Sequence, residues 1–103
     1  MEEHIGDIIV ELNTGGRNPG VIIGVFAEPK QVVGMPSCTG QLDVIWITRD
    51  KSLYLNSPWF KGFNDYEVIV PASDSRADRI KHLAANGIPI EEITELVAIV
   101  ERL

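Results

Sequence analysis

Residues 21–27 read V-I-I-G-V-F-A, and this stretch decides the fold class because β-branched residues stand on both sides of a glycine. Branching at Cβ restricts side-chain rotamers in a helix, so valine and isoleucine favour extended strands. Gly24 is typical of a point where a strand bends or forms a bulge. The stretch is apolar at consecutive positions, which indicates a strand with both faces covered. We therefore predict a β-rich body in which Gly24 forms a corner.

Four further short apolar segments share this character and are expected to be strands. They cover residues 5–12, 42–48, 53–55 and 66–70. The segments between them are rich in Gly, Pro, Asn and Asp, which tolerate or impose turn dihedrals. We expect an exposed loop at 13–20, a long loop at 28–41 of the kind that often binds partners, a tight turn at 49–52 and a turn-rich segment at 56–65.

The sequence pattern changes to a helical period after residue 73. Ser75, followed three residues later by Asp78, resembles a capping box, and Gly87 stands where the first helix would end. Pro89 fits the first position of a second helix. The apolar positions of this second helix span a wide face, which must be buried against the strands, the first helix or another subunit.

The length and composition indicate one domain. A chain of 103 residues with 45% hydrophobic and 23% charged residues is ordinary for a single globular core. We expect residues 1–103 to form a single domain, with a strand body at 5–71 and a helical pair at 73–103 packed on it.

Charge and cysteine content indicate which partners and which cellular compartment to expect. The formal net charge of -6 disfavours binding to nucleic acid, because the average field repels phosphate. Cys38 is the single cysteine, so no intrachain disulfide forms, which fits a reducing compartment. The first residues are acidic where a signal peptide is basic, and no apolar run approaches the length that spans a bilayer. We expect a cytoplasmic protein that does not enter membranes.

Short motifs recur along the strand body: G-D-I-I-V at 6–10, G-V-I-I-G-V at 20–25, V-I-W at 44–46 and Y-E-V-I at 66–69. Together these motifs resemble small Src-homology-3-like (SH3-like) barrels, short versions of which are common among bacteriophage accessory proteins. The resemblance covers residues 5–71 and implies a small five-stranded antiparallel barrel, whereas the helical tail and the long loop at 28–41 depart from the simplest barrel pattern. With the two helices that the sequence pattern predicts, we expect an α+β fold, a barrel followed by a two-helix hairpin. The resemblance also implies a binding module, although fold does not fix function.

Aromatic residues are concentrated after the expected hairpin. Aromatics beside proline and glycine are typical anchors of a protein interface. The candidate partner-binding residues are Tyr54, Trp59, Phe60 and Phe63. The alternative is that two or three of the aromatics here plug the end of the barrel, whereas Trp46, in mid-strand, is expected in the core.

No pattern in the sequence predicts a catalytic, metal or cofactor site. His4 and His82 have no metal-ligand spacing to Cys38 or to each other. Gly15-Gly16-Arg17 lacks the lysine and the following helix of a phosphate-binding loop. We therefore expect no enzyme, no metal and no cofactor.

Three functions remain open from the sequence. The first is a non-enzymatic protein-interaction module, in its specific form a viral accessory protein that binds a host protein. The second is a nucleic-acid-associated module, for which Arg76, Arg79 and Lys81 form the one basic cluster. The third is a homo-oligomer paired through Ile93, Val97 and Val100, which have near-heptad spacing.

Overall fold

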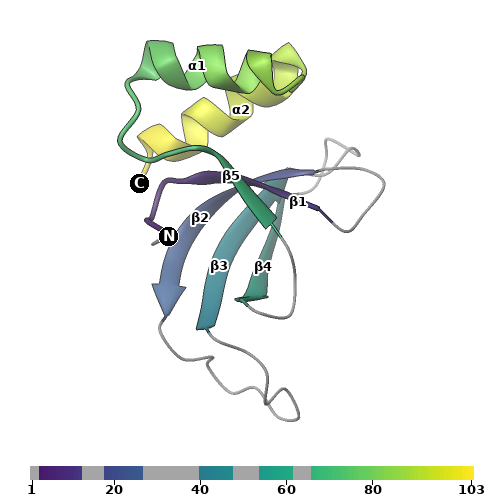
Figure 1. Ribbon diagram of the computed structural model, residues 1–103, viewed down its shortest axis with the longest axis vertical. Helices are drawn as coiled ribbons and strands as arrows, with labels where there is room; N and C mark the ends of the chain where they lie inside the picture. Colours follow the sequence, from purple (N-terminus) through teal and green to yellow (C-terminus); the bar gives the residue numbers. More distant parts are fainter. Residues whose placement is uncertain (1–2, 13–17, 27–39, 48–53, 62–65) are drawn as a thin grey trace.

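An antiparallel sheet and two helices make up the described part of this computed structural model, which covers residues 3–12, 18–26, 40–47, 66–103 and the backbone of 54–61 (Figure 1). The predicted α+β class is confirmed. The elements are β1 (Ile8–Glu11), β2 (Pro19–Phe26), β3 (Gly40–Ile47), β4 (Tyr54–Lys61), β5 (Tyr66–Val70), α1 (Arg76–Ala85) and α2 (Ile90–Glu101).

The sheet is open, so the prediction of a closed barrel is wrong. Its strand order is β4-β3-β2-β1-β5, and every neighbouring pair is antiparallel. β4 and β5 are the two edges, and no ladder joins them within the described residues. Closure requires the two edge strands to share backbone hydrogen bonds, and the apolar pattern of a strand does not encode which strand lies beside it.

Two irregularities bend the sheet. The register between β2 and β3 shifts between Ile22 and Gly24, which confirms the predicted bulge at Gly24. A second shift occurs between Ile8 and Ile9, where β1 pairs with β5. Bulges of this kind kink a strand and increase its twist. The strands in Figure 1 accordingly curve away from the helical layer.

Neighbouring residues of the strands enter two separate cores, one on each face of the sheet. Ile8 and Ile9 are both 0% exposed, yet Ile8 packs in the cluster under the helices and Ile9 in the cluster on the opposite face. Val21 and Ile22 divide in the same way. The consecutive apolar pattern is thereby explained, because both faces of these strands are covered. The cluster on the face away from the helices, here called the inner cluster, contains Ile9, Ile22, Leu42, Val44 and Trp46. The prediction that Trp46 is core is therefore confirmed.

Both helices lie on one face of the sheet, as predicted (Figure 1). Ser75 caps α1, since its Oγ accepts a hydrogen bond from the backbone N–H of Asp78 at 3.2 Å. Gly87, with φ +76°, follows the end of α1 in a conformation that L side chains rarely adopt. Pro89 is the N-cap residue of α2 and not its first helical residue, so the helix begins one residue later than predicted.

β4 runs without a break from Tyr54 to Lys61, where the sequence predicted a short strand at 53–55 and then turns. Asn56, Ser57 and Pro58 favour turns locally, but each pairs with a residue of β3. Tertiary pairing overrides local propensity more readily in strands than in helices. Pro58 is tolerated because β4 is an edge strand, where one side of the backbone needs no ladder hydrogen bond.

Candidate functional site

Three of the four predicted partner-binding aromatics stand in the edge strand β4 and not in a loop. Tyr54 pairs with Ile47, Trp59 with Leu42 and Phe60 with Gln41 in the Cα register.

The two residues opposite Trp59 and Phe60 lie on different faces of the sheet. Leu42 is 0% exposed in the inner cluster. The neighbouring Gln41 donates from its amide Nε2 to Oδ1 of Asp43 at 2.8 Å. The two aromatic positions therefore lie side by side on one edge of the sheet, but Trp59 is paired with a residue of the inner cluster and Phe60 with a residue in a polar contact.

Several predicted features lie outside the described residues. Phe63 is one, and Cys38 in the segment 27–39 is another. The same holds for the loop at 13–17 and the turn at 48–53.

The predicted oligomer face lies inside this chain's own core. Ile93 and Val97 are each 4% exposed and pack in the cluster between α2 and the sheet, and Val100 is partly buried against it. Pairing of two subunits through these three residues would therefore require α2 to leave its sheet. Ile90, expected on the same apolar face, is 66% exposed.

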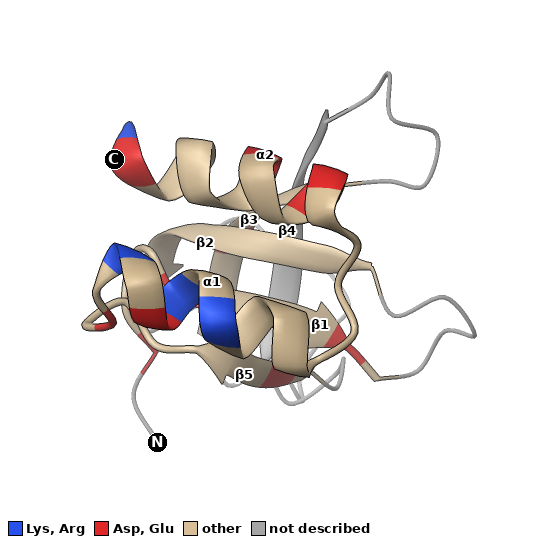
Figure 2. Cartoon of the chain, turned by 90° about the horizontal axis from the view of Figure 1, so that it is seen from above, with Lys and Arg blue, Asp and Glu red and all other residues tan. Residues whose placement is uncertain are grey.

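The basic cluster predicted for nucleic acid does not form one exposed surface. Nε of Arg76 lies 3.2 Å from Oε1 of Glu101 at the end of α2. Arg79 is 7% exposed, and its Nη2 donates to the backbone carbonyl of Asp74 at 2.9 Å. Lys81 is exposed. In Figure 2, α1 interleaves both signs of charge, whereas α2 is mostly uncharged and its charged residues are acidic.

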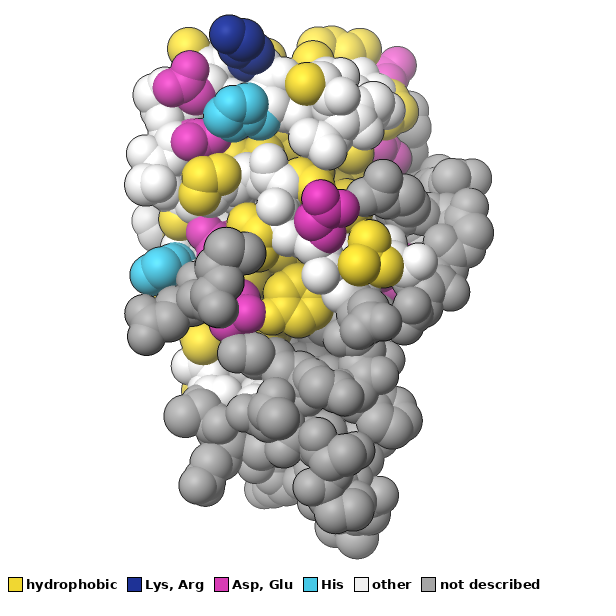
Figure 3. Space-filling model, in the orientation of Figure 1, with side chains coloured by type: hydrophobic (Ala, Val, Ile, Leu, Met, Phe, Trp, Pro, Cys, Tyr) yellow, Lys and Arg dark blue, Asp and Glu magenta, His cyan; other side chains and the backbone are white. Residues whose placement is uncertain are grey.

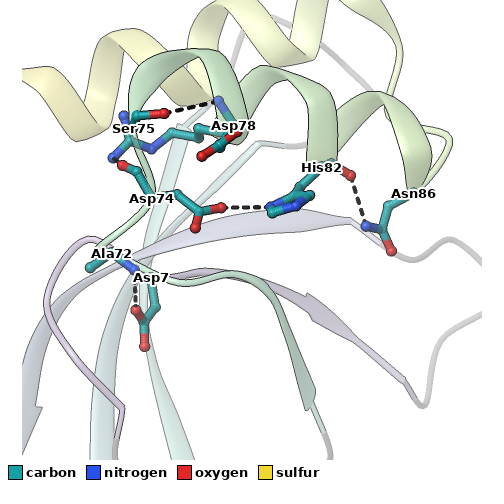
Figure 4. Close-up of polar contacts among 8 residues, drawn as sticks. Asp7, Ala72, Asp74, Ser75, Asp78, His82 and Asn86 are labelled. Atoms are coloured by element: carbon teal, nitrogen blue, oxygen red, sulfur yellow. Dashed lines mark hydrogen bonds and ion pairs between the residues drawn. The ribbon is translucent and has the colours of Figure 1, made fainter.

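Asp7 is the most deeply buried carboxylate in the described chain, at 3% exposure. Its Oδ1 accepts from the backbone N–H of Ala72 at 2.7 Å, and its Oδ2 accepts from that of His4 at 2.9 Å. One side chain thereby joins the turn before β1 to the segment that leads from β5 into α1 (Figure 4). The sequence carried Asp7 only within the Gly-Asp motif of the SH3-like resemblance, which did not predict this link.

Tyr66, at the start of β5, packs against the inner cluster and donates a hydrogen bond from its hydroxyl to the Glu3 carboxylate. Burial disfavours the phenolate and raises the pKa of Tyr66; the bond to Glu3 and the negative charges of Glu3 and Asp7 raise this pKa further. Tyr66 was predicted as the first residue of a strand and as one of the aromatics of the preceding segment; its contact with Glu3 was not predicted, because Glu3 lies 63 positions away.

Asp74 and His82 form a polar pair at the surface of the helical layer (Figure 4). Nδ1 of His82 lies 2.6 Å from Oδ2 of Asp74, and the two side chains are 47% and 15% exposed. A carboxylate on Nδ1 fixes the ring so that Nε2 is the nitrogen left for other contacts. The described residues contain no group of three His, Cys, Asp or Glu side chains arranged to hold a metal ion.

Exposed apolar side chains are distributed over several elements. On the face shown in Figure 3, hydrophobic side chains of the described surface are interspersed with acidic side chains and with the white atoms of other side chains and the backbone. Among the helices described, none is long and apolar enough to cross a membrane. Among the residues whose side chains are described, the large hydrophobic ones with substantial exposure are Ile5, Leu12, Val25, Ile80, Ile90 and Leu103.

Comparisons with models of known protein families, with curated protein sequences and with solved structures gave no match.

Proposed function

We propose that this protein is a non-enzymatic interaction module that binds a protein partner along β4, with Trp59 and Phe60 as the anchors and Tyr54 and Phe63 as further contacts. The observation that supports the proposal most is the position of β4: three of these aromatics stand in an edge strand of an open sheet. Aromatic residues at a sheet edge combine large contact area with nearby unpaired backbone groups, both of which partners use.

Pro58 makes the contact selective. A proline has no backbone N–H, so an added strand cannot form an unbroken ladder along β4. Natural edge strands use proline in this way to prevent indiscriminate strand pairing. The partner is therefore held chiefly by the aromatic residues on either side of Pro58.

The test is affinity capture from a lysate of the native source, or of its host if the protein is viral, as the SH3-like resemblance implies. Wild type is compared with the double variant Trp59→Ala, Phe60→Ala, after circular dichroism has established that the variant is folded. We expect one protein that wild type retains and the variant loses. Mass spectrometry identifies it.

A matched control removes apolar area elsewhere on the surface. Ile80→Ala, Ile90→Ala changes two exposed residues of the helical layer and should retain the partner. Equal capture by wild type and by the folded β4 variant would refute the proposed face. Loss of the partner in the helical variant alone would move the interface to α1 and α2.

A further inference from the structure

Asn86 and Gly87 form the one Asn-Gly dipeptide of the sequence, and they stand at the joint between α1 and α2. Each other asparagine is followed by a larger residue or by proline. Glycine offers the least steric hindrance to attack by its own backbone nitrogen on the preceding asparagine side chain. The dipeptide is exposed in this structure.

The reaction open to such a pair is deamidation. The backbone nitrogen of Gly87, after losing its proton to solvent, attacks Cγ of Asn86; a new N–Cγ bond forms, the Cγ–Nδ2 bond breaks and ammonia leaves. Water then opens the five-membered imide at one of its two carbonyls. The product carries aspartate or isoaspartate at position 86.

In the folded hairpin, two hydrogen bonds of the turn between α1 and α2 oppose this attack; Figure 4 shows the one made by Asn86. The N–H of Gly87 donates to the carbonyl of Ala84 at 3.0 Å, so the nucleophile is occupied. Nδ2 of Asn86 donates to the carbonyl of His82 at 2.8 Å, which holds the amide against the helix end.

The backbone geometry of Asn86 opposes the attack as well. Its ψ is 8°, which nearly eclipses its own backbone nitrogen with that of Gly87. Ring closure requires Cβ in that position instead. The peptide must therefore rotate away from the helix cap before Cγ and the Gly87 nitrogen can meet.

Two residues of the C-terminal cap of α1, Leu83 and Ile88, are anchored in the cluster under the helices. The N–H of Ile88 donates to the carbonyl of Leu83 at 3.2 Å, which with the Gly87 bond completes the two-bond pattern of a Schellman cap. Leu83 is 0% exposed, and Ile88 packs against the same cluster beneath the helices. Rotation of the Asn86–Gly87 peptide thus requires local opening of the helical hairpin.

We propose that Asn86–Gly87 is a deamidation site controlled by the fold: the closed hairpin protects it, and each opening of the hairpin exposes it to reaction. The product weakens the joint that protected it. A carboxylate at the end of α1 is unfavourable to the helix dipole, and the donor to His82 is lost. Isoaspartate also lengthens the backbone within the cap. Deamidation is therefore a one-way step that leaves the hairpin easier to open.

The test follows deamidation of the full chain by peptide mass spectrometry at neutral pH and body temperature, in buffer and in concentrated urea. We expect the rate in buffer to be lower by about tenfold or more, the factor that an opening free energy of about 1.4 kcal/mol supplies. Equal rates in the two solvents, or no reaction in urea, would overturn the proposal.

Two variants distinguish local opening from general destabilisation. Ile88→Ala weakens the cap and should raise the rate in buffer by about fivefold, as about 1 kcal/mol of lost stability does, without changing the rate in urea. Arg76→Ala breaks the pair with Glu101 at the far end of the hairpin and should leave both rates unchanged. A rate in buffer that Ile88→Ala does not raise, or that Arg76→Ala raises equally, would show that the cap does not control the reaction.

Discussion

Gly20 in β2 lies directly beneath the ring of Trp46. A Cβ atom at this position would stand 2.6 Å from Cε3 of Trp46 and 2.6 Å from Cγ1 of Val44. Both neighbours are buried, so neither can move aside freely. Gly20→Ala should lower the free energy of unfolding by about 1–3 kcal/mol through overpacking, measured by urea denaturation.

Gly24 in the same strand provides the matched control for Gly20. Its added Cβ would meet Cε2 of Phe26 at 3.2 Å, a contact that a small shift relieves. Gly24→Ala should therefore cost less than Gly20→Ala. An equal or larger loss at Gly24 would show that the close approach to Trp46 does not limit position 20.

Because of Tyr66, we expect the free energy of unfolding to depend on pH in the alkaline range. Its pKa is raised in the folded state above the usual value of about 10, so above that pH the folded chain holds a proton that the unfolded chain has lost. The stability that the neutral phenol contributes is full below pH ~10 and falls as pH rises through the folded pKa. Unfolding curves of wild type should show this decline.

Tyr66→Phe is the variant that isolates this effect. It keeps the ring against the inner cluster and removes both the titrating group and the bond to Glu3. The free energy of unfolding of the variant should decline less steeply above pH ~10 than that of wild type. Parallel curves for the two proteins would contradict the assignment.

At the scale of elements, the start of α1 depends on Ser75. Its Oγ accepts from the N–H of Asp78, one of the donors that a helix leaves without an internal partner. Ser75→Ala should lower the free energy of unfolding by about 1 kcal/mol. Ser73→Ala, at an exposed serine just before the helix, is the control and should change it by less than about 0.5 kcal/mol. Similar losses in both variants, measured by thermal unfolding, would refute the cap.

The helical elements were predicted more closely than the strand pairing. Ser75 and Asp78 act together at the start of α1, and Gly87 acts on the last turn of the helix beside it, so each of the signals that begin and end α1 is local and visible in the sequence. The extent of β4 depends on β3, whose partner residues precede it by 7 to 21 positions in the chain. No local pattern around Asn56–Pro58 could report that pairing.

At the scale of the whole molecule, α2 packs on the sheet of its own chain, because its buried residues belong to the cluster under the helices. Ile93→Ala should lower the free energy of unfolding by about 2–5 kcal/mol, because a buried aliphatic side chain is lost from the cluster between α2 and the sheet. The unfolding midpoint of wild type should not depend on protein concentration.

Ile90→Ala, on the same helix but 66% exposed, is the control and should change stability by about 0.5 kcal/mol or less. A midpoint that rises with protein concentration in wild type, and no longer does so in Ile93→Ala, would indicate that α2 packs between subunits.

The sequence by itself determined that strands precede two C-terminal helices, that both faces of the strands are covered, and that a bulge falls beside Gly24, but it did not determine the length of β4. These properties follow from local propensity, apolar period and capping chemistry. Only the tertiary structure decided that the sheet stays open, that the aromatics Tyr54, Trp59 and Phe60 stand on an edge strand, and that Asp7 joins the sheet to the helical pair. The physical reason is that each depends on contacts between residues distant in sequence, which hydrophobic pattern permits but does not specify.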